Sequence, residues 1–175
     1  MKHATLLLAA LLGLSQCRKK DPDPLSQLPP ATQTGANTFG CLLNGQAWTP
    51  QGNSGTSNYS VAYCCTADGG VLDIAVYRIN SATQDYQHII LFSRQLNKTG
   101  AYNFTNTNQT SASINDRKNG CYLDSQDVGV FHKGQLVITR FDLQAGIIAG
   151  TFDFVLAKPG CDTVRVTKGR FDKKL

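Results

Sequence analysis

Short apolar runs alternate with turn-forming residues from residue 38 to the end of the chain, a pattern typical of an antiparallel sandwich or barrel. The clearest hairpin joins residues 38–43 to residues 46–50 through Asn44 and Gly45. Asn-Gly supplies the two positive φ angles of a type I′ turn, which favours a tight hairpin here. We therefore predict an all-β fold, a single antiparallel β-sandwich or barrel-like domain, over residues 38–175.

The same pattern predicts the remaining strands and one of the inward faces. A second hairpin joins residues 59–65 to residues 71–79 through a turn at Asp68-Gly69. In the 71–79 strand the more apolar face, which we expect to point inward, is formed by Leu72, Ile74, Val76 and Arg78. Further strands are expected at 86–93, 99–104, 111–114, 121–123, 128–131, 135–143, 147–157, 163–167 and 170–173, with a turn at Lys168-Gly169.

The N-terminus has the pattern of an export signal. A short basic start precedes an apolar block at residues 4–14, which is too short to span a bilayer. The residues Leu-Ser-Gln-Cys that end at Cys17 resemble the lipobox of bacterial lipoproteins, where a diacylglycerol is joined to the cysteine before cleavage. We expect residues 1–16 to be a signal peptide and Cys17 to carry the lipid. The alternative is an ordinary secretory signal with an incidental cysteine.

Residues 17–37 are expected to be a lipid anchor followed by a proline-rich tether. Four of the six prolines fall in this stretch, which has no periodic apolar pattern. At about 3.1 Å per residue it would reach roughly 60 Å. The membrane is thus a partner through Cys17, and we expect the exported protein at the outer membrane or cell surface.

Two segments resemble a family of uncharacterised lipoproteins of Bacteroidota that carry a domain of unknown function. They are TGANTFGCLLNGQAWTP at residues 34–50 and IIAGTFDFVLAKPGCDTVRVTKGRFDKK at residues 147–174. The resemblance implies a lipid-anchored, exported β domain without an established activity. Since each segment carries one cysteine, and the first and last strands of sandwiches often lie close, we predict a disulfide between Cys41 and Cys161. Export permits disulfides, and the three other cysteines of the domain make the number odd, so at least one thiol stays unpaired.

The sequence offers little chemistry beyond these cysteines, and we expect a protein that is not an enzyme and has no cofactor. It lacks a GxSxG motif and the cysteine and histidine spacing of a zinc site, and His88 and His132 have no evident partner. Four aspartates are expected to cap turns, and the alternative for them is calcium binding; they are Asp68, Asp73, Asp124 and Asp127. Thr163 lies in an Asp-Thr-Val sequence that resembles a Bacteroidota O-glycosylation sequon.

The charge of the domain argues against nucleic acid as a partner, and two functional hypotheses remain. Four of the 17 basic residues and two of the 12 acidic residues precede residue 38, so the domain carries only about +3 and, being exported, is not expected to bind nucleic acid. The first hypothesis is a module that binds a glycan, peptide or protein through loops 52–55 and 105–120. Aromatic rings for such a site are available at Trp48, Tyr59, Tyr63, Tyr77, Tyr86 and Tyr102, although strand aromatics usually pack in the sheet. The alternative is a structural or assembly subunit of an envelope complex, recognised through an edge strand.

Overall fold

The structure is a computed structural model that describes residues 22–66, 69–80, 82–83, 85–105, 107 and 109–175. The expected signal peptide, Cys17 and Asp68 therefore lie outside the described residues. Across the described ranges, no helix is long and apolar enough to cross a membrane. One short 3-10 helix, η1 (Pro24–Gln27), precedes the strands, and the Asp23 carboxylate caps it by accepting from the Leu25 N–H.

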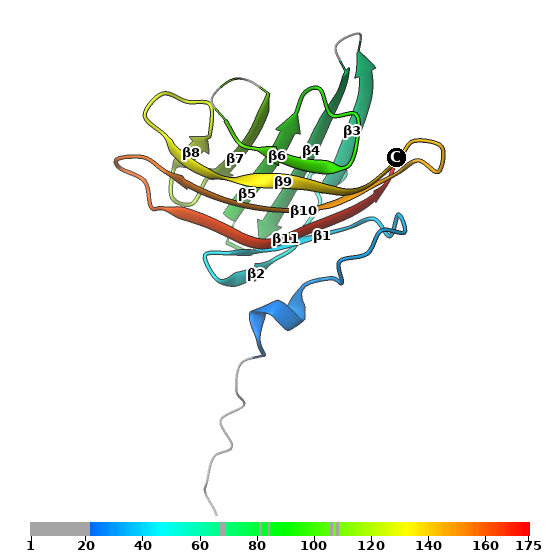
Figure 1. The fold of residues 1–175 in the computed structure, drawn as a ribbon. Coiled ribbons are helices and arrows are strands. Elements are labelled where there is room, and N and C mark those ends of the chain that lie inside the picture. Colours follow the sequence, from blue (N-terminus) through cyan, green and yellow to red (C-terminus); the bar gives the residue numbers. More distant parts are fainter. Residues whose placement is uncertain (1–21, 67–68, 81, 84, 106, 108) are drawn as a thin grey trace, which may run out of the picture.

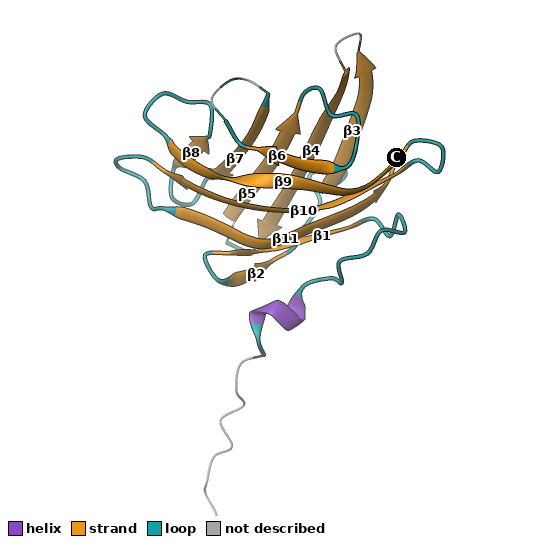
Figure 2. Cartoon of the chain, viewed as in Figure 1, coloured by secondary structure: helices purple, strands orange, loops and turns teal. Residues whose placement is uncertain are grey.

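Two antiparallel sheets pack face to face and confirm the predicted all-β sandwich (Figures 1 and 2). The six-stranded sheet has the order β2-β1-β11-β10-β9-β6 and consists of β1 (Thr38–Leu43), β2 (Gln46–Trp48), β6 (Gly100–Asn103), β9 (Phe131–Asp142), β10 (Ile147–Ala157) and β11 (Val164–Lys174). The five-stranded sheet has the order β3-β4-β5-β7-β8 and consists of β3 (Tyr59–Thr66), β4 (Gly69–Asn80), β5 (Asp85–Ser93), β7 (Thr110–Asp116) and β8 (Cys121–Asp124).

The tight turn of the first hairpin is confirmed, because Asn44 and Gly45 have φ angles of 49° and 82°. The strand predicted at residues 128–131 is wrong. Val128 is fully exposed in a turn closed by the bond from the Val130 N–H to the Asp127 carbonyl, and β9 starts only at Phe131.

The turn predicted at Lys168-Gly169 is also wrong, because β11 continues through these residues as one strand with a bulge. Lys168 has a φ of 54°, and the register of β11 against β10 shifts between Phe152 and Phe154. At Gly169 a Cβ atom would lie 2.5 Å from the ring of Phe152, so only glycine fits there. The polar Lys-Gly pair therefore marks a kink within the strand rather than its end.

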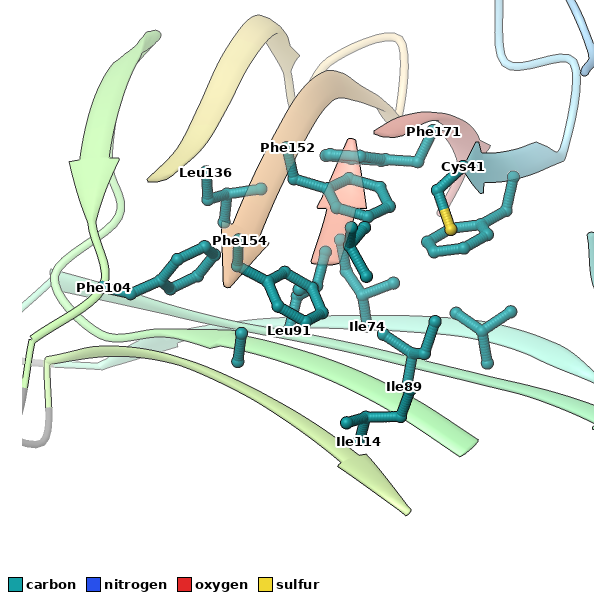
Figure 3. Packing of buried hydrophobic residues seen from close by; sticks show 14 of the residues in the cluster. Cys41, Ile74, Ile89, Leu91, Phe104, Ile114, Leu136, Phe152, Phe154 and Phe171 are labelled. Carbon is teal, nitrogen blue, oxygen red and sulfur yellow. The ribbon is translucent and has the colours of Figure 1, made fainter. Parts of the chain in front are cut away.

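The core lies between the sheets. It is formed by every second residue of each strand, whose side chain points inward. Figure 3 shows Phe152 and Phe154 of the six-stranded sheet facing Ile74 and Leu91 of the five-stranded sheet. The inward face predicted for the 71–79 strand is confirmed, since the side chains of Leu72, Ile74 and Val76 are all fully buried.

Residues 28–37, called the N-terminal strap below, lie against the domain, which corrects the second half of the predicted tether. Leu28 is buried, and Pro29 occupies the space over Gly40, where a Cβ atom would come within 2.7 Å of its Cδ. The Arg140 guanidinium donates to the carbonyl of Gln33 at 2.6 Å. Proline-rich composition had favoured an extended tether, but these contacts give the strap a fixed place on the sheet.

The buried carboxylate of Asp172 on β11 holds the N-terminal strap in place. It accepts hydrogen bonds from the backbone N–H groups of Thr34, Gly35 and Ala36 at 2.7–3.1 Å and from the Thr32 hydroxyl at 2.7 Å. Burial by itself raises the pKa of Asp172, but these hydrogen bonds outweigh it and hold the pKa below its ordinary value. The carboxylate is thus charged and fully satisfied without a cationic partner.

The disulfide of the domain joins Cys121 to Cys161, so the predicted pairing of Cys41 with Cys161 is wrong. The first and last strands do pair, but Leu42 lies opposite Thr167, which is already three residues, or roughly 10 Å, into β11, whereas Cys161 lies in the loop before β11 begins at Val164. A disulfide needs Cα atoms within about 7 Å. Cys41 is instead a buried thiol in the core, where burial raises its pKa to about 12 in spite of the nearby positive charge of Arg170.

Candidate functional site

A cleft opens between the two sheets, where the β1–β2 hairpin faces β4, β5, β7 and β8. Its volume of about 420 Å³ falls in the range of small-molecule sites. The walls combine apolar and polar side chains, which is the usual character of such sites. We call this site the inter-sheet cleft; the residues that matter below are Leu43, Trp48, Arg78, Gln87, Ile114, Asp116, Leu123 and Val164.

Three polar side chains form a row across the inner face of the five-stranded sheet. Arg78 of β4 lies opposite Gln87 of β5, and Gln87 lies opposite Asp116 of β7. One step further into the sandwich, the next inward row is entirely apolar and consists of Val76, Ile89, Ile114 and Leu123. The cleft therefore begins where the inner face changes from apolar to polar.

A chain of hydrogen bonds ties this polar row to the opposite sheet. The Trp48 indole Nε1 donates to Gln87 Oε1 at 2.9 Å, and Gln87 Nε2 donates to Asp116 Oδ2 at 3.0 Å. Trp48 is 1% exposed, so its N–H needs this partner. Both polar atoms of the Gln87 amide are engaged, and the side chain is held in one orientation.

Asp116 is satisfied by neutral donors at the turn between β7 and β8. Besides Gln87, it accepts from Asn119 Nδ2 at 3.2 Å and from the backbone N–H of Lys118 at 3.1 Å. The Lys118 ammonium lies 3.6 Å from Asp85, in an ion pair whose lysine is exposed and whose aspartate is partly buried. The charge of Asp116 is thus used to cap the turn and to orient Gln87.

Arg78 differs from its neighbours because its charge has no counterpart. Within the described part of the chain, the ion pairs join Lys118 to Asp85 and Arg140 to Asp142, so no carboxylate pairs with Arg78. Its guanidinium makes one long hydrogen bond of 3.5 Å to the carbonyl of Ala47. A half-buried guanidinium with most of its five donors uncommitted lies in the wall of the cleft.

The aromatic residues considered for sugar stacking mostly pack elsewhere. Trp48 reaches the cleft, while Tyr59 is buried against Phe39 and Tyr63 packs on Phe141. The Tyr102 hydroxyl donates to the carbonyl of Lys98. No aromatic platform forms from these described rings.

The loop at residues 52–55 is attached to Tyr77. The hydroxyl of Tyr77 accepts from the Ser54 N–H and donates to the Thr56 carbonyl, and the bond from Ser54 lowers its pKa. Tyr86 stacks on Tyr77, and the Arg117 guanidinium lies 4.4 Å from the centre of the Tyr86 ring. The segment 105–120, expected to be a binding loop, contains strand β7. The end of β7 and the turn that follows it contribute Asp116, Lys118 and Asn119 to the wall of the inter-sheet cleft.

The two histidines do not form a site with the aspartates. His88 lies on the outer face of β5, where burial lowers its pKa and Asp73 partly opposes that shift. The ring of His132 lies 3.4 Å from the carbonyl of Val130. Asp124 caps a turn as expected, because it accepts from the Gln126 N–H at 2.9 Å. In the ranges that the structure describes, no three His, Cys or Asp side chains gather to hold a metal ion.

A second hollow, of about 960 Å³, lies on the outer face of the six-stranded sheet, and we call it the outer groove. Its charged side chains Lys133, Asp153 and Arg165 are all exposed. Charges in contact with water bind an ion weakly, because solvent screens them. The inter-sheet cleft, with an apolar wall on both sides, is the better candidate site.

The polar row was missed as a site, although the sequence carried a signal for it. Strand alternation puts Arg78 on the same inward face as Leu72, Ile74 and Val76, and a charged residue at such a position is unusual. Gln87 and Asp116 could be joined to it only through the register of β4, β5 and β7.

The fold and the cleft define the class of this protein, an antiparallel β-sandwich with a ligand-sized opening between its sheets. The chain belongs to the family described as domain of unknown function (DUF6252), which matches residues 66–173. That match covers β4 to β11, including Arg78, Gln87, Asp116 and the disulfide, and starts after Trp48. No match was found among curated proteins or among solved structures.

Proposed function

We propose that the protein is a lipid-anchored, non-enzymatic binding module of the bacterial cell envelope, and that its inter-sheet cleft binds a small, partly apolar ligand. The observation that supports this function is one cleft of about 420 Å³ in which the hydrogen-bonded polar row meets Ile114 and Leu123 of the apolar row. Small-molecule sites combine an apolar surface with a few oriented polar groups in this way.

The proposed location rests on the N-terminal sequence. The apolar block at residues 4–14 followed by Cys17 supports export and lipidation, and the Cys121–Cys161 disulfide suits an oxidising compartment. The intact mass of protein purified from host membranes tests this. We expect a chain that begins at Cys17 and carries acyl chains; a chain that begins elsewhere without lipid would refute the anchor.

Binding to the cleft is testable because Trp48 is the only tryptophan of the chain. The neutral dye N-phenyl-1-naphthylamine absorbs where tryptophan emits, so energy transfer from Trp48 reports dye bound nearby. We expect saturable transfer with a stoichiometry of one dye per chain. Absence of saturable transfer would overturn the proposed function.

A matched pair of variants shows whether the dye is in the cleft. Val164→Phe adds volume to the cleft wall, and Val155→Phe makes the same change in the outer groove. We expect the first to weaken dye binding about tenfold or more and the second to leave it unchanged. Equal effects of the two variants would place the dye outside the cleft.

The alternative, a structural subunit recognised through an edge strand, has less support. Three of the four edge strands, β2, β6 and β8, are only three or four residues long. Short edges expose few unpaired backbone groups to a partner strand. The cleft therefore supports a binding function better than the edges support assembly.

A further inference from the structure

We propose that the ligand of the inter-sheet cleft is a single-chain amphipath with an anionic head, carboxylate or phosphate, that pairs with Arg78 while its chain lies on the apolar row. This inference rests on the proposed function and adds the chemical class of the ligand. The shared chemistry is an oxyanion attached to an apolar chain.

We assign the anionic head of the ligand to Arg78 because the neighbouring side chains make their hydrogen bonds to other groups. Gln87, its neighbour in the row, directs Oε1 to Trp48 and Nε2 to Asp116, so neither atom serves the guanidinium. Asp116 lies two strands from Arg78, and no ion pair forms between them; the ion pairs of the described residues are Lys118–Asp85 and Arg140–Asp142. Arg78 is therefore the charged group of the polar row that has no oppositely charged partner and makes only the long hydrogen bond to the Ala47 carbonyl.

The other charges near the cleft are already used or face water. Lys118 is paired with Asp85, and Asp116 accepts three hydrogen bonds from neutral donors. Asp162 is exposed at the far end of the cleft, next to Cys161. An anion therefore finds at Arg78 a guanidinium that no carboxylate of the described residues pairs with, whereas a cation would find the Asp116 oxygens already engaged by three donors.

The geometry of a guanidinium specifies the kind of anion. Its planar fork of N–H donors matches the two oxygens of a carboxylate or a phosphate, and such bidentate pairs are stronger and more directional than single hydrogen bonds. The half-buried position of Arg78 makes the pair stronger than it would be in bulk water.

The distance between the polar row and the apolar row indicates where the apolar chain of the ligand lies. The polar and apolar rows are two residues apart along each strand, or about 7 Å. A ligand whose head meets Arg78 therefore reaches Ile114 and Leu123 with its first few carbons. Leu43 and Val164 close the opposite wall from the six-stranded sheet, so the chain has apolar surface on both sides.

The test is displacement of N-phenyl-1-naphthylamine from the wild-type domain by four ten-carbon compounds below their micelle-forming concentrations. Decanoate and decyl phosphate carry an anionic head, decanol a neutral one and decyltrimethylammonium a cationic one. We expect at least one anion to displace the dye at about tenfold lower concentration than decanol, and the cation to be no better than decanol. The preferred anion tells a carboxylate ligand from a phosphate ligand.

Variants at Arg78 connect the preference to the proposed residue. We expect Arg78→Gln to abolish the advantage of the anions, so that in this variant the anions and decanol displace the dye at similar concentrations, and Arg78→Lys to keep part of the advantage. The control is Arg165→Gln, an exposed arginine of the outer groove whose backbone alone hydrogen-bonds to Asn44. Circular dichroism and a cooperative urea unfolding transition would show that the variants fold.

The possible results separate this inference from the proposed function. If the dye does not bind at all, the proposed function fails and this inference fails with it. If the dye binds but the anions are no better than decanol, or if Arg78→Gln keeps their advantage, the ligand class is wrong and the cleft remains a binding site.

Discussion

The indole of Trp48 donates a hydrogen bond of 2.9 Å to the side-chain carbonyl of Gln87 and so joins the β2 edge of one sheet to the middle of the other. The two residues are 39 positions apart in the chain and lie on strands that do not pair. This bond links the two sheets at the polar end of the inter-sheet cleft. Its loss should affect both stability and the shape of the site.

Replacing Gln87 by Met should lower the free energy of unfolding by about 1–3 kcal/mol, because the buried Trp48 N–H loses its acceptor. Urea unfolding followed by Trp48 fluorescence measures the change. The control is Gln135→Met on the outer face of β9, which we expect to shift stability by less than about 0.5 kcal/mol. Equal shifts would mean that the Trp48–Gln87 bond contributes nothing.

The disulfide should contribute substantially to stability because it closes a long loop. Cys121 and Cys161 are 40 residues apart, for which chain entropy gives about 4 kcal/mol. We expect the double variant Cys121→Ala and Cys161→Ala to lose about 2–4 kcal/mol in urea unfolding. The single variant Cys161→Ala should be equally destabilised, since either change removes the bridge; a single variant as stable as the wild type would contradict the pairing.

Asp172 should contribute stability that depends on pH. Its pKa in the folded state lies below the ordinary value of about 3.9, so the contribution is complete above about pH 4 and is lost as the pH falls through the lowered pKa. Asp172→Asn should cost about 2–4 kcal/mol at pH 7, because the amide replaces a charged acceptor of several hydrogen bonds.

Unfolding free energies of the wild type and of Asp172→Asn, measured from pH 7 to pH 2, test this prediction. The difference between the two proteins should shrink below about pH 4. Asp153→Asn, at an exposed position of β10, is the control and should follow the wild type throughout. A difference that stays constant down to pH 2 would show that the charge of Asp172 is not what holds the N-terminal strap.

The thiol of Cys41 should be unreactive in the folded protein, since it is fully buried and its pKa is raised to about 12. With iodoacetamide at pH 8, peptide mass spectrometry should find Cys41 unmodified in native protein. In protein unfolded by urea without reductant, the same residue should be modified within minutes. Rapid modification in the native state would contradict its position in the core.

Local pattern was sufficient where neighbours in sequence decide the structure. The hairpin at Asn44-Gly45 and the buried face of β4 followed from turn chemistry and from the alternation of side chains along a strand. The same reasoning failed at Lys168-Gly169, because a bulge and a turn use the same residue types, and only pairing with Phe152 distinguishes them.

Neighbouring residues are enough to specify an all-β domain with one hairpin of known turn type, because strand alternation and turn preferences are local properties of the chain. Three relationships arise only in the folded chain: Cys161 bonds to Cys121, Asp172 holds the N-terminal strap, and Arg78, Gln87 and Asp116 form one row. These relationships depend on strand order and register between distant segments. Strand order and register arise from packing of the whole core, and no local run of residues encodes them.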